Sequence, residues 1–205
     1  MLSLLPFLYI NVMIQLLNRE VVLLLYKLLR CILRLLFSIL YRVSVIGTIE
    51  LSDNIGYMIC SNHIHMFDPV FIACFTNRQI SFMGKKELFD KPIIGSILKK
   101  LGAFPVDRGK GDIEALKTAI DVLKSNNVMS MFPEGTRSKT GEMGEFKRGA
   151  ALIASRAEVP IVPVKIIGNY RLFSKMELRI GEPLYPTKEN KKTLIEELYN
   201  NIKKL

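Results

Sequence analysis

The chain has 205 residues, 49% of them apolar, and carries 29 lysines and arginines against 19 aspartates and glutamates, a net charge of +10. This length suits one domain with a hydrophobic core and is short for two. A chain this basic can bind nucleic acid, anionic lipid or phosphorylated small molecules, and the position of its apolar residues decides among them. The three cysteines form no CxxC pair, which argues against a zinc ribbon or a disulfide framework and favours a reducing, cytoplasmic compartment.

Residues 1–41 are far more apolar than the rest of the chain and predict a membrane-associated helical arm. Residues 1–18 contain no charged side chain and are about the minimum length for a membrane span, but a proline and two amides interrupt them. In residues 19–41 the polar side chains occupy one arc of roughly 100° on an ideal helix, and most of the remaining surface is Leu, Ile, Val and Phe. The members of this polar arc are Arg19, Glu20, Lys27, Arg30, Arg34, Ser38 and Tyr41.

The polar arc favours a helix that lies in the membrane interface over one that spans the membrane. Spanning would bury Lys27, Arg30 and Arg34 near the bilayer centre, at a cost of about 9 kcal/mol in total on an insertion scale. In the interface the basic side can instead meet anionic headgroups. Two alternatives stay open: an amphipathic helix packed on the domain's own core, and a re-entrant or spanning first helix.

From Gly47 onward, short apolar runs alternate with helical patterns, which predicts an α/β domain over residues 42–205. The alternation indicates a single domain with a largely parallel mixed sheet flanked by helices. Ligands of such sheets bind beyond the carboxyl ends of the strands, so functional residues are expected there. Strands are expected at about 56–61, 79–84, 102–106, 127–132 and 159–167, and helices at about 69–77, 86–100, 112–125, 145–157 and 187–204.

The stretch SNHIHMFDP, residues 61–69, follows the first of these strands and holds the only two histidines of the chain. Pro69 suits the first turn of a helix and the residue before a proline avoids the helical region, so Asp68 is expected to be the helix N-cap. Asp68 can also accept a hydrogen bond from His63 across the loop, which would fix the imidazole tautomer and leave the other nitrogen as a base. Such a pair can take a proton from an alcohol held nearby.

A metal site and a cysteine nucleophile are the competing interpretations of this stretch. The run HIHMFD looks like a ligand run of binuclear zinc hydrolases, but those sites need further histidines and this chain has only His63 and His65. Cys60 and Cys74 would complete only an irregular ligand set. Cys60 also falls within an apolar strand, where a thiol is expected to pack. We therefore expect neither a metal nor any other cofactor.

Two loops after later strands carry basic and turn-forming residues. The stretch LGAFPVDRGKGD places Arg108 after an apolar run, with two glycines that permit a close approach; a solvated turn is the alternative. The stretch MFPEGTRS places Glu134, Gly135, Thr136 and Arg137 directly after a strand. Backbone N–H groups, a hydroxyl and a guanidinium in one loop suit a bound phosphate.

Together these motifs resemble those of the glycerolipid acyltransferases, in particular the bacterial 1-acyl-sn-glycerol-3-phosphate acyltransferases. The order and spacing of the blocks agree over roughly residues 45–170, and the apolar arm fits as well. One departure is His65, where family members often have serine; it is taken as neutral to the chemistry. The family blocks NHxxxxD, GxxxxxR, FPEGTRS and a run rich in Val, Pro and Ile are matched by Asn62, His63 and Asp68, by Gly102 and Arg108, by residues 132–138 and by residues 159–164.

The resemblance implies transfer of an acyl chain from acyl-CoA or acyl carrier protein to the sn-2 hydroxyl of lysophosphatidic acid, giving phosphatidic acid. His63, oriented by Asp68, would be the general base, and the Arg137 loop would hold the acceptor's phosphate. Glu134 would position the glycerol or Arg137. The other substrate-binding residues that the resemblance implies are Asn62, Lys85 (with Lys86 the weaker match), Arg108, Gly135 and Thr136.

A lipid acceptor and a basic surface imply that the protein works at the cytoplasmic face of the cell membrane. We expect an anionic membrane surface as its partner and no binding to nucleic acid. Within the family, the alternative acceptors are glycerol-3-phosphate and another lysophospholipid. Outside it, the alternatives are a non-catalytic module that binds anionic lipid and a metal-dependent hydrolase. The sequence leaves open the acyl donor, its chain length, the depth of the arm and the oligomeric state.

Overall fold

The fold is that of a computed structural model, which describes the backbone of residues 5–107 and 112–205 and the side chains from residue 20 onward within these ranges. Strands and helices alternate along most of the chain. The helices are α1 (Leu5–Leu40), α2 (Asp68–Phe75), α3 (Lys86–Phe89), α4 (Pro92–Lys100), α5 (Ile113–Lys124), α6 (Gly149–Ala157) and α7 (Leu194–Lys204). The strands are β1 (Arg42–Ile46), β2 (Tyr57–Ser61), β3 (Ile80–Lys85), β4 (Phe104–Val106), β5 (Val128–Met131), β6 (Ile161–Ile167) and β7 (Lys175–Ile180).

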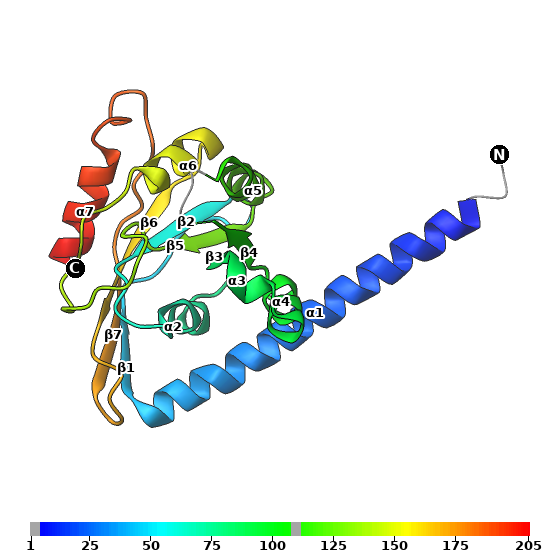
Figure 1. The fold of residues 1–205 in the computed structure, drawn as a ribbon, viewed down its shortest axis with the longest axis horizontal. Helices are drawn as coiled ribbons and strands as arrows, with labels where there is room; N and C mark the ends of the chain where they lie inside the picture. Colours follow the sequence, from blue (N-terminus) through cyan, green and yellow to red (C-terminus); the bar gives the residue numbers. More distant parts are fainter. Residues whose placement is uncertain (1–4, 108–111) are drawn as a thin grey trace.

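The strands form one seven-stranded mixed sheet in the order β1-β7-β6-β2-β5-β3-β4. Neighbouring strands are parallel except β6 and β7, which are antiparallel. Helices α1 and α2 cover one face of the sheet, and α5, α6 and α7 cover the other (Figure 1). The prediction of a single α/β domain with a largely parallel mixed sheet flanked by helices is therefore confirmed.

Strand β2 lies at the centre of the sheet and is buried along its whole length. Because successive side chains of a strand point to opposite faces, its residues divide between two hydrophobic clusters. Met58 and Cys60 pack with residues of α5, α6 and α7, whereas Tyr57 and Ile59 pack with residues of α1 and α2. The strand end that carries SNHIHMFDP is thus fixed from both faces of the sheet.

Several elements differ from the sequence prediction. The helix expected over 86–100 is two helices, α3 and α4, because Pro92 has no N–H to donate within a helix and instead begins a new one. The helices expected over 145–157 and 187–204 begin only at Gly149 and Leu194. Strands β1 and β7 are missing from the prediction, although RVSVI and KMELRI alternate polar and apolar residues as half-buried strands do.

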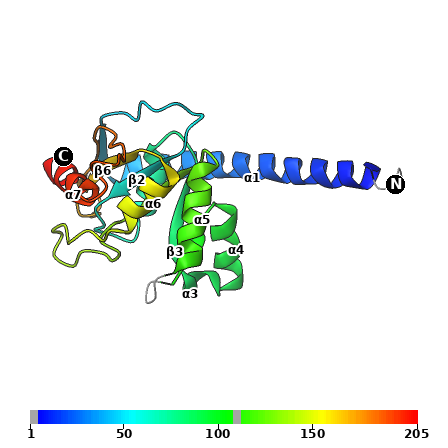
Figure 2. The same ribbon diagram turned by 90° about the horizontal axis from the view of Figure 1, so that it is seen from above.

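Helix α1 is one continuous helix whose N-terminal part extends away from the domain (Figure 2). Its C-terminal part packs on the domain through Tyr26 and Phe37, which are buried. Between them, the Arg30 guanidinium donates hydrogen bonds to the carbonyl oxygens of Thr76 (3.0 Å) and Asn77 (2.8 Å), just beyond the C-terminal end of α2. A cation at this position also opposes the negative end of the α2 dipole.

Part of the polar arc of α1 therefore binds the domain, which corrects the expectation that this side of the helix meets headgroups. Arg34 belongs to the same contact, because its guanidinium lies 5.4 Å from the centre of the Phe75 ring. Lys27 is exposed. In the part of the chain that the structure describes, no helix is both long and apolar enough to cross a membrane.

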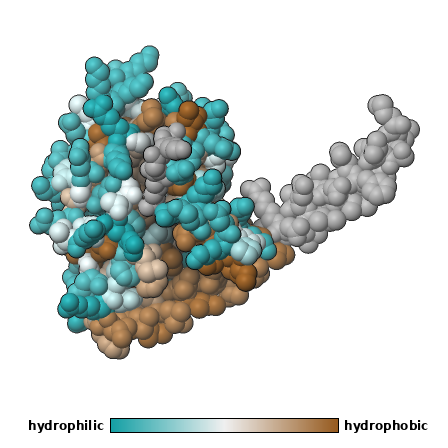
Figure 3. All heavy atoms as spheres, viewed as in Figure 1, coloured by the Kyte–Doolittle hydropathy of each residue, from teal (hydrophilic) through white to brown (hydrophobic). Residues whose placement is uncertain are grey.

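The opposite side of α1 is an exposed surface of large aliphatic side chains, here called the apolar face of α1. Figure 3 shows it as a brown band along the lower edge of the molecule. Neighbouring α4 adds three more exposed side chains, Ile93, Ile94 and Ile97. The apolar face of α1 consists of Val21, Leu24, Leu25, Leu28, Ile32, Leu35, Leu36 and Ile39, whose exposed fractions lie between 45% and 70%.

Candidate active site

His63 and Asp68 lie together at the carboxyl end of β2, as the sequence predicts. The His63 Nδ1 atom is 2.7 Å from Asp68 Oδ2. Asp68 is fully buried and His63 is only 9% exposed. With the carboxylate on Nδ1, the imidazole donates its Nδ1–H to Asp68, and the lone pair of Nε2 is left to accept a proton.

The expectation that Asp68 is the N-cap of its helix is wrong. The N-cap of α2 is Phe67, and no side chain caps this end. Asp68 is the first helical residue, and its carboxylate turns back toward the preceding loop, where Oδ2 accepts hydrogen bonds from the backbone N–H groups of Ile64 and His65, both at 2.7 Å. Asp68 therefore holds the loop that presents His63 rather than the helix that follows it.

Asp68 Oδ1 has a partner that the sequence motifs did not indicate. The hydroxyl of Tyr170, in the loop between β6 and β7, donates to it at 2.8 Å. The Tyr170 ring stacks on the His65 ring, with the centroids 4.6 Å apart and the planes 25° apart. Nothing local could have predicted this bond, because 102 residues separate the two partners along the chain.

Glu134 is buried and binds backbone N–H groups, while its expected role in positioning the glycerol or Arg137 stays a prediction. Its Oε1 accepts from the backbone N–H of His63 at 2.8 Å, and its Oε2 accepts from the N–H of Gly144 at 2.9 Å. The Ser138 N–H in turn donates to the His63 carbonyl at 2.8 Å. The FPEGTRS loop thus binds both the backbone N–H and the backbone carbonyl of His63 in the SNHIHMFDP loop.

Asn62 has a similar structural role, and its expected contact with substrate stays a prediction. Its side-chain amide donates to the carbonyl of Ile166 at 2.9 Å and accepts from the N–H of the same residue at 2.8 Å. The side-chain amide therefore makes the two hydrogen bonds to β6 that a further backbone pair would make beyond the end of β2. Asn62 fixes the start of the loop on which His63 stands.

A cavity of about 250 Å³ lies beside the His63 ring. Phe132 forms one wall by stacking on the imidazole, with a centroid distance of 4.0 Å and an interplanar angle of 17°. Gly135 and Lys147 line the same cavity. Gly135 has φ +73°, a left-handed backbone conformation that favours glycine, and a Cβ placed on it would lie 3.0 Å from the Lys147 ammonium at the flexible end of that side chain.

Lys147 is a candidate site residue that the sequence interpretation missed. It precedes α6 in the stretch GEFKRGA and lines the His63 cavity from there. Among the residues that the structure describes, no carboxylate forms an ion pair with it. It lies outside the motifs that the sequence offers, and only the fold brings it over Gly135.

The remaining predicted cations lie farther out or beyond the described residues. Thr136 and Arg137 are exposed, and the described residues offer Arg137 no ion-pair partner. Lys85 is exposed at the end of β3 and pairs with Glu87 at 2.9 Å, while Lys86 begins α3. Arg108 falls outside the described residues.

A second cavity, of about 310 Å³, lies between α1, α2, α4 and β3 and is lined almost wholly by apolar side chains. It shares Pro69, Phe82 and Met83 with the His63 cavity. Leu29 and Leu33 of α1 form part of its wall. This apolar cavity therefore borders the His63 cavity on the side where α1 packs on the domain.

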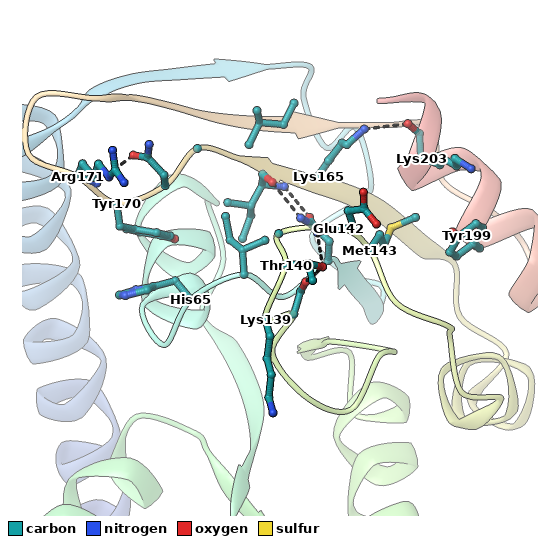
Figure 4. Close-up of a pocket in the computed structure, with 18 residues that line it drawn as sticks. His65, Lys139, Thr140, Glu142, Met143, Lys165, Tyr170, Arg171, Tyr199 and Lys203 are labelled. Atoms are coloured by element: carbon teal, nitrogen blue, oxygen red, sulfur yellow. Dashed lines mark hydrogen bonds between the residues drawn. The ribbon is translucent and has the colours of Figure 1, made fainter.

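A polar groove of about 1030 Å³ lies on the other side of the SNHIHMFDP loop, between residues 138–143, the end of β6 and α7. Figure 4 shows Lys165 and Lys203 on its α7 side and the facing side chains of His65 and Tyr170 on its α2 side. The Lys165 ammonium donates to the Lys203 carbonyl at 2.8 Å. The groove and the His63 cavity thus flank the same loop.

The two buried cysteines, Cys60 and Cys74, are poor nucleophiles and poor ligands. Burial raises the pKa of the Cys60 thiol far above its ordinary value and that of Cys74 to about 11, so both remain protonated near neutral pH. In the described ranges, no three His, Cys, Asp or Glu side chains cluster closely enough to hold a metal ion.

The fold and the site define an α/β protein that carries a histidine–carboxylate pair at the carboxyl end of a central parallel strand. Residues 42–167 match the family model described as Acyltransferase. The chain belongs to the acyltransferase family and is an enzyme, which confirms the resemblance seen in the motifs.

Curated relatives and a solved structure agree with this assignment. The 1-acyl-sn-glycerol-3-phosphate acyltransferase of Bacillus subtilis (strain 168) is 37% identical over 193 residues, which cover 88% of this chain and 96% of that protein. The enzyme of the same name from Streptococcus pneumoniae is 38% identical over 136 residues, 63% of this chain and 50% of that protein. The crystal structure of the 1-acyl-sn-glycerophosphate (LPA) acyltransferase PlsC from Thermotoga maritima is similar at a TM-score of 0.65 and 28% identity, covering 79% of this chain and 71% of that one.

Proposed function

We propose that the chain transfers an acyl group from a thioester to the sn-2 hydroxyl of lysophosphatidic acid and so makes phosphatidic acid. The observation that carries this proposal is the 2.7 Å contact between His63 Nδ1 and Asp68 Oδ2 beside a cavity open to substrate. The names of the relatives support the same acceptor. The proposal assigns one proton-transfer group and needs no metal.

In the proposed reaction, His63 Nε2 takes the proton of the acceptor hydroxyl as its oxygen attacks the thioester carbonyl. The new carbon–oxygen bond gives a tetrahedral intermediate, whose collapse breaks the carbon–sulfur bond. The departing thiolate takes the proton back from the imidazolium. Asp68 stabilises that imidazolium and keeps the ring in the tautomer with Nδ1–H.

The acceptor's phosphate is assigned to the open, cationic side of the His63 cavity. Thr136 and Arg137 follow Gly135, which lines the cavity, and are exposed with donors to offer, and Lys147 lines the cavity itself. A guanidinium can bind two phosphate oxygens at once. Lys85 and Arg108 would add positive potential around this side.

The acyl chain is assigned to the apolar cavity between α1, α2 and α4. Its lining excludes charged headgroups but suits methylene groups, each of which is stabilised by about 0.8 kcal/mol on burial. The shared residue Phe82 connects this cavity to the His63 cavity, where the thioester carbonyl must lie. Both acyl-CoA and acyl carrier protein can deliver such a chain.

The membrane partner is assigned to the apolar face of α1 together with the exposed isoleucines of α4. Exposed apolar patches of this kind mark interaction surfaces. Lys91, Lys99 and Lys100 lie at the two ends of α4, where they can meet anionic headgroups. We therefore place the enzyme at the cytoplasmic face of the cell membrane, lying on it rather than across it.

The test is acyl transfer by the purified full chain in detergent, with lysophosphatidic acid, glycerol-3-phosphate and lysophosphatidylcholine as acceptors and with both donors. We expect lysophosphatidic acid to be preferred and His63→Ala to lower the rate at least roughly 10³-fold while binding to anionic vesicles persists. Full activity of His63→Ala would reject the base and favour a lipid-binding module. Preference for glycerol-3-phosphate would reject the acceptor, and loss of activity with a chelator would revive the metal hydrolase.

A further inference from the structure

The two oxygens of Asp68 have different partners. Oδ2 accepts three hydrogen bonds at 2.7 Å, from His63 Nδ1 and from two backbone N–H groups of its own loop. Oδ1 accepts from the Tyr170 hydroxyl at 2.8 Å. Among the described residues, Tyr170 is the one partner of this buried carboxylate that comes from a distant part of the chain.

Tyr170 is held firmly for this contact. Its ring packs edge-on against Tyr41 and Phe71, with centroids 5.8 Å and 6.0 Å away, and stacks on His65. Its backbone has φ +52°, a left-handed conformation that costs free energy for a residue other than glycine. Strain of this kind persists where the surroundings impose it, and here the surroundings aim the hydroxyl at Asp68.

The hydroxyl is the donor in this bond. Burial first, and then the charge of Asp68, raise the pKa of Tyr170 well above its ordinary value, so the phenol stays protonated. Figure 4 shows the side chains of His65 and Tyr170 close together at the wall of the polar groove. They come from the loops after β2 and β6.

We propose that Tyr170 is a positioning residue: its hydroxyl fixes the Asp68 carboxylate, and through Asp68 it sets the orientation and basicity of His63. The inference deepens the proposed function, on which it rests for the catalytic use of His63. The His65 ring, stacked on Tyr170, supports the same arrangement from the other side.

The direction of the effect follows from the charge on Asp68. A donor on Oδ1 draws electron density from the carboxylate and weakens its pull on a protonated imidazole. Without this donor, the imidazolium gains stability and the pKa of His63 rises. Among the described residues, the other charged groups near His63 are Glu134, bound to its backbone, and Lys147, which lines its cavity; the Tyr170 hydroxyl donates to Asp68 and to neither of them.

The experiment is Tyr170→Phe in the full chain, with the His63 ring titrated by NMR. The chain has only two histidines, and a His65→Gln variant assigns them. We expect the pKa of His63 to rise in Tyr170→Phe. The matched control is Tyr41→Phe, which removes a hydroxyl from the same aromatic cluster but leaves the bond to Asp68; its His63 should titrate as in the original chain.

Kinetics complete the test. Tyr170→Phe should lower kcat roughly ten- to a hundredfold, as when an outer partner that orients a functional imidazole is lost, with KM for both substrates unchanged. The acidic limb of the pH profile of kcat/KM should move to higher pH. In an Asp68→Asn background the same substitution should have little further effect.

An unchanged His63 titration in a folded Tyr170→Phe protein would overturn the inference, even if activity fell. So would loss of activity that only follows a lower Tm, with the pH profile unmoved. The titration does not depend on turnover: a shifted His63 pKa in a chain without acyltransferase activity would support Tyr170 while rejecting the proposed function.

Discussion

The carboxylates and the cations of the candidate site are built in opposite ways. Asp68 and Glu134 are buried, and each of their four oxygens accepts a hydrogen bond from the protein. Arg137 is exposed and has no ion-pair partner among the described residues. The fold therefore completes the proton-transfer side in advance, whereas the proposed phosphate side is left for a ligand to complete.

Asp68→Asn should lower activity most severely, because it alters the proton-transfer side that the fold completes. An amide keeps one acceptor oxygen but not the charge that stabilises the imidazolium, and its NH₂ can hold the wrong tautomer of His63. We expect kcat to fall by about 10³ to 10⁴, with KM for the acceptor little changed. Steady-state kinetics with lysophosphatidic acid checks this, and a loss confined to KM would contradict it.

Arg137→Ala should affect binding instead of chemistry. Removing a guanidinium from a phosphate costs about 1.5–3 kcal/mol, so KM for lysophosphatidic acid should rise about ten- to a hundredfold. Because Arg137 is exposed, Tm should stay the same. Arg137→Lys is the control, and it should recover part of the affinity. Equal loss with an acceptor that lacks phosphate would reject the assignment.

Glu134→Gln should lower the stability of the folded protein and leave its affinity for the acceptor nearly unchanged. One oxygen of the side chain becomes an NH₂ that faces a backbone N–H, of His63 or of Gly144, and cannot accept its hydrogen bond. A buried donor left unpaired costs about 1–3 kcal/mol. Thermal unfolding should show a lower Tm, while KM for the acceptor stays near its original value. A raised KM at unchanged Tm would mean that Glu134 contacts substrate.

The smallest effect is expected at a carboxylate away from the site. Hydrogen bonds from Lys175 and Arg179 hold the pKa of Glu177 below its ordinary value. This stabilisation is present at pH above the ordinary glutamate pKa and is lost as pH falls through the lowered one. Between neutral pH and pH 4, the Tm of the original chain should therefore fall slightly more than that of Glu177→Gln. Parallel curves would contradict this.

The sequence predicted the elements and pairings that depend on local order. The alternation of strands and helices indicated the sheet, and the five-residue spacing of His63 and Asp68 across a loop indicated their contact. The cap assigned to Asp68 failed because the same carboxylate binds backbone donors in the preceding loop instead. A motif identifies a side chain, but several backbone donors can compete for it.

Contacts between segments far apart in the chain could not be predicted from the sequence. Tyr170 meets Asp68, and Lys147 meets Gly135, only after β6 and the FPEGTRS loop have been placed beside β2. The motifs also did not indicate that Asn62 and Glu134 bind backbone, which they do because a polar side chain at a strand end can pair with backbone groups that the ladder leaves unpaired.

The short helix α2 links the two ends of this arrangement. Arg30 of α1 holds the backbone just beyond its C-terminal end, and Asp68 stands at its N-terminal end. Eight helical residues, about 12 Å in length, lie between these two contacts. The packing of α1 and the position of the His63 loop are therefore coupled through one short helix.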